Sequence, residues 1–343
     1  MLAKREGDYL SQVPSNVNLV DIKASKLAFS TNLLGSYLRE TKPDVLISAN
    51  ERVNIVALMA RKLYRPKTRV IISVHTNNTE QIANRDASFY KKIVLKIARL
   101  VYKWADQVVA VSEGVARDAI KIFKLSPDNV TVIYNPIVTS EINDKMKMQV
   151  DHPWFNRPGG PVIIGVGRLV AQKDFFTLVD SFVEVKKASP DAKLIILGEG
   201  EKRKALENKI SALGLKNDVS LPGFVENPYS YLHNASVFVL SSAWEGFGNV
   251  LVEAMATGTP VVSTDCPSGP SEILDKGRYG PLVPPGDAEK LAHSIIAVLN
   301  KPPEPALLKR RASNFTVGNA VNEYIELINH RGINHGLNKK GKT

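Results

Sequence analysis

The sequence predicts an α/β protein built from two doubly wound domains. Short apolar runs rich in Val, Ile and Leu recur along the chain, and they lack the polar alternation of half-exposed strands. This pattern is typical of strands buried on both faces of a parallel sheet. Longer amphipathic stretches separate the runs, as expected for helices that cover both faces. The length of 343 residues suits about two such domains.

The expected strands fall into two groups. In the first half they are Asn16–Ile22, Asp44–Ser48, Arg69–Val74, Gln107–Val111 and Val130–Tyr134. In the second half they are Pro161–Val166, Lys193–Leu197, Asp218–Leu221, Val237–Ser241 and Pro260–Ser263. The clearest helices are Asp174–Ala188 and Glu201–Leu215. Because a doubly wound domain usually opens with a strand that feeds a tight glycine turn, and none follows Asn16–Ile22, we expect an incomplete N-terminal domain.

The domain division follows from breaks in this pattern. Residues 139–160 contain few strand signals and end in Pro and Gly, so they are expected to link an N-terminal domain at 1–138 to a C-terminal domain at 161–312. A last helix is expected within 313–330, over Ala320–Asn329. The basic tail at 331–343 is expected to be disordered.

Composition limits the partners and the compartment. The net charge of +11, from 45 Lys and Arg against 34 Asp and Glu, favours anionic partners such as nucleic acid, phosphorylated ligands or acidic lipids. The single cysteine, Cys266, excludes an intrachain disulfide framework and a cysteine zinc site, and the six histidines lack metal-ligand spacing, so no metal or cofactor is expected. No apolar run approaches the roughly 18 residues of a membrane span, and no signal peptide is evident, so we expect a cytoplasmic protein.

The stretch from Ser241 to Thr264 carries the main candidate site. A buried strand runs into a glycine-rich turn and then a helix, and ligands of open α/β sheets bind at such carboxyl ends of strands. Gly246 and Gly248 allow a ligand to approach the backbone closely, and the start of the helix favours a phosphate. Glu245 lies at the strand end where the ligand is expected. Glu253 lies one turn into the helix and can accept hydrogen bonds from ribose hydroxyls. The alternative is that both are ordinary loop and surface acids.

A second strand end carries two cations. Arg168 and Lys173 bracket the turn in "VGRLVAQKD" (Val166–Asp174). Two cations in this position can neutralise a diphosphate without a metal ion. The alternative is that they are ordinary surface cations.

The chain resembles the family 4 retaining glycosyltransferases, which have the two-domain GT-B fold. The resemblance is carried by "GRLVAQKD", "LGEGEKRKAL", "GPLVPPGDAEKLA" and the long segment "LPGFVENPYSYLHNASVFVLSSAWEGFGNVLVEAMATGTPVVSTDCPSGPSEIL", and it extends from about Pro161 to Asn300. It is weaker in the first half, in "RVIISVHTNN", "ADQVVAVSEGVARDAI" and "VTVIYNPI". It implies two Rossmann-like domains that face a cleft, with the acceptor on the N-terminal side.

The resemblance also implies roles for particular residues. Arg168 and Lys173 would clamp the donor diphosphate, Glu245 would touch the transferred sugar, and Glu253 would hold the ribose. His75, at a strand end, would lie near the transferred sugar. The remaining donor-binding positions implied are Gly167, Gly198, Glu199, Phe224, Val225, Gly246, Phe247, Gly248, Asn249 and Val250.

The implied reaction moves a hexose or N-acetylhexosamine, with retained configuration and without metal, from a nucleotide diphosphate sugar. The donor is expected to be a UDP-sugar, and the acceptor a glycan or lipid-linked sugar in cell-surface polysaccharide synthesis. One alternative is a catalytically inactive nucleotide-sugar-binding homologue, because the opening segment of the family is not seen. A nicotinamide dehydrogenase is disfavoured, since "GVGRLV" offers only Gly-x-Gly. Nucleic-acid binding is disfavoured, because no stacking platform or helix-turn-helix signal is present.

A basic amphipathic stretch suggests a further partner. Residues 87–107, "ASFYKKIVLKIARLVYKWADQ", mix Lys and Arg with large apolar residues at helical spacing. Such a helix can lie on an anionic membrane surface, here the inner membrane face. The alternative is a helix packed on its own domain with a basic outer face.

Overall fold

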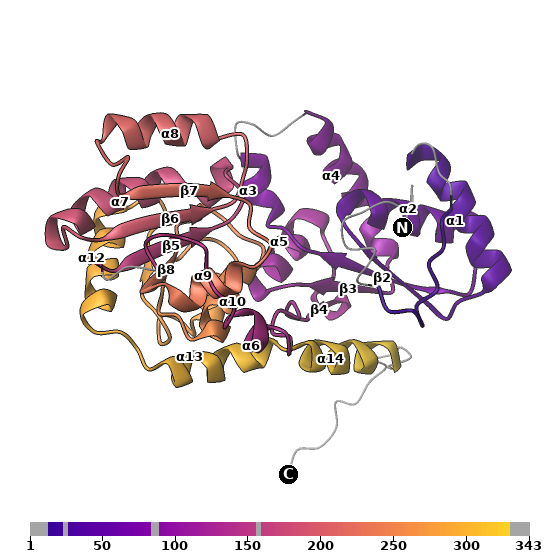
Figure 1. Cartoon of the computed structure of the whole chain (residues 1–343). Coiled ribbons are helices and arrows are strands. Elements are labelled where there is room, and N and C mark those ends of the chain that lie inside the picture. The colour runs from indigo at the N-terminus through magenta and orange to yellow at the C-terminus, as the bar shows by residue number, and fades with distance from the viewer. Residues whose placement is uncertain (1–12, 23–26, 84–88, 156–158, 330–343) are drawn as a thin grey trace, which may run out of the picture.

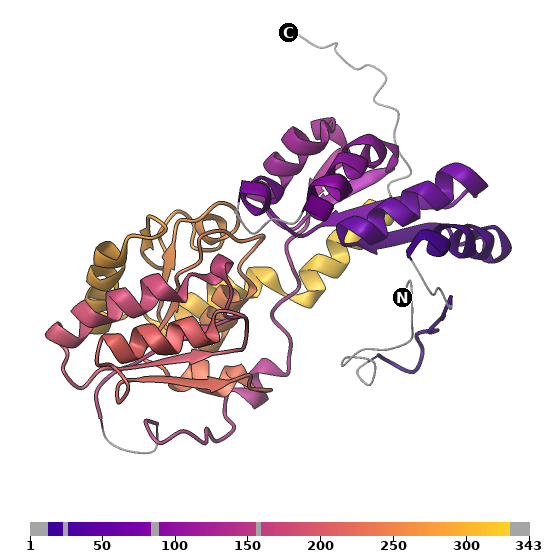
Figure 2. The ribbon, with the colours of Figure 1, turned by 90° about the horizontal axis from the view of Figure 1, so that it is seen from above.

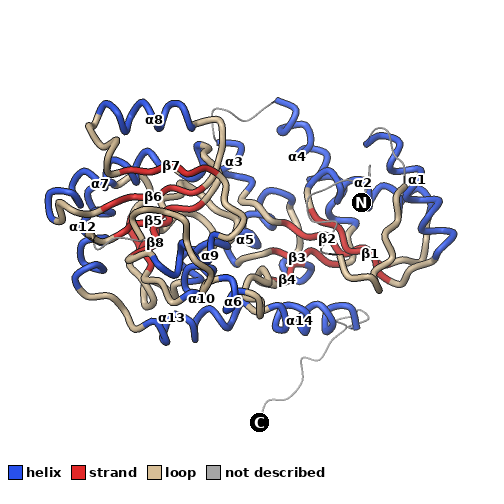
Figure 3. Tube along the Cα trace, in the orientation of Figure 1, coloured by secondary structure: helices blue, strands red, loops and turns tan. Residues whose placement is uncertain are grey.

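The computed structural model describes residues 13–22, 27–83, 89–155 and 159–329. It confirms the α/β class: two parallel sheets form two lobes, and helices cover their faces (Figures 1 and 3). The expected basic tail at 331–343 lies outside the described residues.

The first lobe is built on a four-stranded parallel sheet in the order β1-β2-β3-β4, with Val45 opposite Arg69 and Val108 opposite Val130. Its elements are α1 (Leu27–Thr41), β1 (Val45–Ala49), α2 (Glu51–Tyr64), β2 (Arg69–Val74), α3 (Asn78–Ala83), α4 (Phe89–Val101), the 3-10 helix η2 (Tyr102–Trp104), β3 (Gln107–Ala110), α5 (Glu113–Phe123), η3 (Pro127–Asn129) and β4 (Val130–Val132).

The prediction of a strand at Asn16–Ile22 is wrong. This segment forms a turn followed by irregular chain. Val17 is about half exposed, and the described part of the first sheet ends at β1, so no neighbouring strand pairs with the segment. Apolar composition alone could not show that the ladder of backbone hydrogen bonds was missing.

The second lobe contains a six-stranded parallel sheet in the order β10-β9-β8-β5-β6-β7. Its elements are β5 (Val162–Val166), η4 (Ala171–Lys173), α7 (Phe175–Ala188), β6 (Lys193–Leu197), α8 (Arg203–Ala212), β7 (Val219–Gly223), α9 (Pro228–Asn234), β8 (Val237–Leu240), α10 (Asn249–Thr257), β9 (Val261–Thr264), α11 (Pro270–Ile273), β10 (Leu282–Val283), α12 (Ala288–Asn300) and α13 (Pro305–Ala312). The edge strand β10 was not predicted, because two residues are too short to show any periodicity. Between the lobes, the stretch expected as a linker includes the short helix α6 (Ile142–Lys145).

The last helix returns to the first lobe. After η5 (Ser313–Phe315), α14 (Val317–Asn329) runs from the second lobe to the outside of the first sheet (Figure 2). Ala320 is buried there against Ile71 and Val109 of β2 and β3. Arg69 Nη1 donates a hydrogen bond to the carbonyl of Ile328 at 2.7 Å. Over the described ranges the chain therefore crosses between the lobes twice, once before β5 and once before α14.

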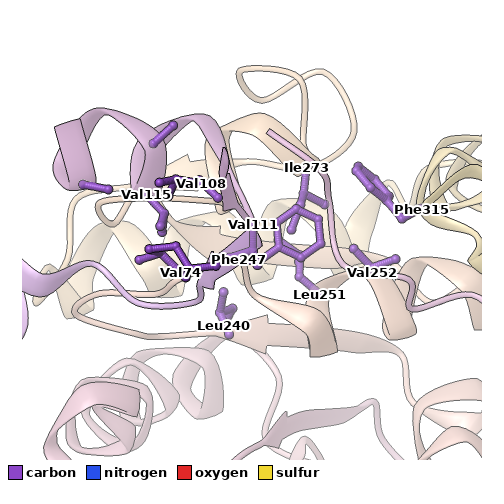
Figure 4. Packing of buried hydrophobic residues seen from close by; sticks show 14 of the residues in the cluster. Val74, Val108, Val111, Val115, Leu240, Phe247, Leu251, Val252, Ile273 and Phe315 are labelled. Atoms are coloured by element: carbon purple, nitrogen blue, oxygen red, sulfur yellow. The ribbon is translucent and has the colours of Figure 1, made fainter. Parts of the chain in front are cut away.

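One hydrophobic cluster extends across both lobes. Val74 and Val115 of the first lobe belong to the same buried cluster as Leu240, Phe247 and Ile273 of the second (Figure 4). A separate cluster fills the opposite face of the second sheet. The shared cluster holds the carboxyl ends of β2 and β8 close together, which is where the predicted site residues lie.

Candidate active site

Glu245 lies at the centre of the candidate site. It follows β8, and only 5% of its surface is exposed. Lys173 Nζ donates to Glu245 Oε1 at 2.5 Å, and Ser242 Oγ donates to the same oxygen at 2.6 Å. Gln172 Nε2 lies 3.5 Å from Oε2. A buried carboxylate requires such partners, since burying an unpaired charge is costly.

Two loops hold Lys173 in this position. Ser241 Oγ donates to the carbonyl of Lys173 at 2.8 Å, and the N–H of Ala243 donates to the carbonyl of Gln172 at 2.8 Å. The side chain of Lys173 passes so close to Gly167 that a Cβ at that glycine would crowd it. The loop after β5 is thereby fastened to the loop after β8, and the cation and the acid meet.

The start of α10 has the features of an anion-binding site. Gly248 precedes the helix with φ 101°, a conformation that favours glycine, and no side chain of the described residues caps this end. Asn249 is exposed, and its Oδ1 accepts a hydrogen bond from Asn135 Nδ2 of the first lobe at 2.9 Å. An amino end without a side-chain cap leaves backbone N–H groups and the positive end of the helix dipole for an anion.

Glu253 lies one turn into α10, with Val250 partly exposed beside the helix start. Burial raises the pKa of Glu253 to about 7, and the positive charge of Lys173 opposes that rise. Lys173 and Glu245 are thus in direct contact, and Glu253 lies in the helix that follows the turn of Glu245.

Phe247 departs from its expected position. Its ring is 2% exposed, stacks on Tyr134 with 5.4 Å between centroids, and packs edge-on against Phe315 at 5.4 Å. The side chain therefore belongs to the core between the lobes, where a large apolar ring gains more than at a polar mouth. Only the backbone of Phe247 remains available to line the turn.

The other predicted donor-site residues differ in burial and in the contacts that they make. Gly198 lies against the carbonyl of Gly167, where a Cβ would overlap it. Glu199 is committed to an ion pair with Arg203, at 2.6 Å. Phe224 is 74% exposed at the end of β7, and Val225 beside it is partly buried. Arg168 is exposed, so it does not share the buried contacts of Lys173.

His75 approaches this site from the first lobe. It follows β2, and its carbonyl lies so near Gly246 that a Cβ there would overlap it. Ser73 Oγ and His75 Nε2 are hydrogen-bonded at 2.9 Å. Partial burial of the ring lowers the pKa of His75, and the charge of Glu51 acts in the opposite direction. A pocket of about 240 Å³ opens beside it, lined also by Asn50 and Tyr102.

Sequence reasoning missed two residues that hold Glu245. Ser242 and Gln172 both reach its carboxylate. The available signal was their position: Ser242 stands three residues before Glu245, and Gln172 immediately precedes Lys173. Within the described ranges, no group of three or more His, Cys, Asp or Glu side chains could hold a metal ion.

Comparison with known proteins identifies the family of the chain. Residues 150–315 match the family described as glycosyl transferases group 1, and residues 3–141 match glycosyltransferase family 4. The chain belongs to glycosyltransferase family 4. It also has the expected GT-B fold: it superposes on Anabaena HepE, solved in complex with UDP, with a TM-score of 0.72 at 20% identity over 87% of this chain and 81% of that one.

Two curated relatives are more similar in sequence. An uncharacterised glycosyltransferase of Methanocaldococcus jannaschii is 32% identical over 271 residues, 74% of this chain and 66% of that protein. A Campylobacter jejuni enzyme, N-acetylgalactosamine-N,N'-diacetylbacillosaminyl-diphospho-undecaprenol 4-alpha-N-acetylgalactosaminyltransferase, is 33% identical over 232 residues, 68% and 60% of the two chains. The chain thus spans about two thirds or less of the length of each of these relatives. None of its described helices combines the length and the apolarity that crossing a membrane requires.

Proposed function

We propose that this chain transfers a hexose or N-acetylhexosamine, with retained configuration, from a nucleotide diphosphate sugar. The observation that carries the proposal is the contact of Lys173 with Glu245 beside the start of α10, across from His75. A cation, a helix amino end and acids on either side match the charge pattern of such a donor: a diphosphate between two rings rich in hydroxyls.

The residues would act on the bond to the departing diphosphate. As that bond breaks, negative charge grows on the diphosphate oxygen, and Lys173, Arg168 and the N–H groups at Asn249 would stabilise it. Fixed donors aimed at developing charge contribute about 3–4 kcal/mol each. Glu253 would accept hydrogen bonds from the ribose and Glu245 from the transferred sugar. In this mechanism protein cations and the helix end perform the role that a metal ion performs elsewhere.

The acceptor is proposed from the relatives. The Campylobacter enzyme is named for a diphospho-undecaprenol acceptor, and an Erwinia amylovora relative, 27% identical, is named for amylovoran biosynthesis. UDP is the nucleotide in the solved HepE complex. We therefore propose a UDP-sugar donor and a lipid-linked or glycan acceptor in surface polysaccharide synthesis.

A donor panel tests this function. The full chain is incubated with UDP-, GDP- and dTDP-sugars and a polyprenyl-diphosphate sugar, with and without EDTA. We expect transfer from one UDP-sugar, unchanged by EDTA, and an α-linked product from an α-linked donor by NMR. Tight UDP-sugar binding without transfer would favour the alternative of an inactive binding homologue. Absence of binding to every nucleotide sugar would reject both.

We also propose that α4 rests on an anionic membrane. Tyr90, Ile93, Ile97 and Leu100 are exposed on this helix, between 39% and 62%, while Leu95 and Ala98 on its opposite side are buried. The helix contains four cations and no acid within Phe89–Val101. An exposed apolar stripe beside cations suits the boundary between lipid headgroups and acyl chains. Docking there would place the protein peripherally on the inner face of the membrane, where a lipid-linked acceptor would lie.

A further inference from the structure

The two lobes are joined where α5 begins. Glu272, in α11 of the second lobe, accepts hydrogen bonds from the backbone N–H groups of Glu113 at 2.7 Å and Gly114 at 2.9 Å. These are the first two residues of α5, whose first N–H groups have no partner inside the helix. A carboxylate at this end is favoured by the hydrogen bonds and by the helix dipole. The cap comes from a residue 158 positions further along the chain than Gly114.

The surrounding contacts show that this is a close fit between backbones. A Cβ on Gly114 would overlap the Cα of Ser268 in the second lobe. Asn77 Nδ2 donates to Ser268 Oγ at 3.0 Å. Ser112 Oγ donates at 2.7 Å to the carbonyl of Gly246, in the turn that follows β8. The contact is therefore continuous with the turn on which the donor is proposed to bind.

Glu272 is held in place on its own lobe. Arg311 Nη2 donates to the carbonyl of Glu272 at 2.6 Å, and Arg311 Nε donates to the carbonyl of Ile273 at 2.8 Å. Burial and the nearby charge of Glu272 raise the pKa of Tyr134 to about 12. The backbone of Glu272 is thus fixed within the second lobe, and its carboxylate extends from there to the helix of the first.

We propose that Glu272 is a positioning residue that latches the two lobes together through the amino end of α5. The latch keeps His75 against the turn at Gly246. Its effect on sugar transfer rests on the proposed function. The donor-binding groups lie in the second lobe, so the latch acts on the juxtaposition of the lobes and not on the donor contacts themselves.

Two substitutions test the latch from opposite lobes. Glu272→Ala removes the carboxylate, and Gly114→Ala introduces a methyl group that meets the backbone at Ser268. Alanine is a better helix former than glycine, so Gly114→Ala leaves α5 stable. Gly318→Ala is the matched control: it is also the second residue of a helix, and the nearest atom to its added Cβ is Thr316 Oγ1 at 4.0 Å.

Small-angle scattering and hydrogen exchange on the full chain give readouts that do not depend on activity. We expect both test variants to scatter as a more extended particle than wild type, and the control to match wild type. In Glu272→Ala, amides at the start of α5 should exchange about tenfold faster, because hydrogen bonds to a charged group are lost. UDP-hexose affinity should stay within about twofold while turnover falls about tenfold.

Wild-type scattering in either variant, with a normal melting curve, would overturn the latch. If Glu272→Ala does not fold, Gly114→Ala decides the question. Failure of wild type to bind UDP-hexose would reject the proposed function and leave the scattering test of the latch intact.

Discussion

Lys173 Nζ lies 2.5 Å from Glu245 Oε1, so the cation proposed to grip the diphosphate and the acid proposed to touch the sugar are already bonded to each other. The side chains are only 15% and 7% exposed. Buried partners of this kind depend on one another, because removing one leaves the other charged and unpaired.

This pair gives a stability prediction. Lys173→Met should lower the free energy of unfolding by about 3–5 kcal/mol, since Glu245 is left buried without its cation. The double variant Lys173→Met/Glu245→Gln should recover most of that loss but not the activity. Urea unfolding with donor-binding titrations measures both. Lys193→Met offers a control, because its ion pair with Asp218 is more exposed. Equal losses of unfolding free energy in both lysine variants would contradict the prediction that the buried Lys173 contact contributes more to stability.

The raised pKa of Glu253 predicts that both stability and donor binding depend on pH. Its pKa is raised to about 7, above the ordinary carboxyl value, so the folded protein holds this proton more tightly than the unfolded chain does. The resulting stability is present below the ordinary pKa and is lost as pH rises from about 4.5 through 7. Donor binding should respond in the opposite way, because only the carboxylate accepts both ribose hydroxyls.

Calorimetry at pH 6 and pH 8 checks this effect. UDP-glucose is the suitable ligand, because its diphosphate does not titrate near neutral pH. Wild type should bind more tightly at pH 8, and Glu253→Gln should bind weakly and equally at both. A pH dependence that survives in Glu253→Gln would assign the titration to another group.

The family resemblance implies that the loop Gly223–Pro228 lies near the base of the donor, and Phe224 gives a prediction for that contact. It is 74% exposed at the end of β7, so Phe224→Ala should change the free energy of unfolding by no more than about 0.5 kcal/mol. If the ring stacks on the base, UDP affinity should fall about tenfold. Leu213→Ala, at another exposed apolar residue of the same lobe, is the control. Unchanged UDP affinity in Phe224→Ala would place the base elsewhere.

The membrane proposal is tested on α4. Ile93→Ser/Ile97→Ser/Leu100→Ser should fold normally, because these side chains are exposed, but should no longer float with vesicles containing anionic lipid. Met59→Ser/Leu63→Ser, on exposed positions of α2, is the control. Binding of wild type to anionic vesicles should weaken with salt. If the wild type does not float with anionic vesicles, the exposed apolar residues of α4 serve another purpose.

Local sequence was sufficient for most of the fold. Arg69–Val74 and Lys193–Leu197 match β2 and β6 at both ends, because a buried parallel strand must be apolar along its whole length. The positions of Glu245 and Lys173 at strand ends could be predicted for the same reason. The prediction of a strand at Asn16–Ile22 was wrong, because an apolar segment becomes a strand only when a neighbouring strand completes its hydrogen bonds.

Local residue patterns specify the alternation of strands and helices and the strand ends at which acids, cations and glycines stand, because each depends only on neighbouring residues. Long-range packing sets three other features: Phe247 turns its ring into the core, α14 packs on the first sheet, and Glu272 caps α5 in the other lobe. Each of these depends on surfaces far apart in the chain that meet only after both lobes have folded.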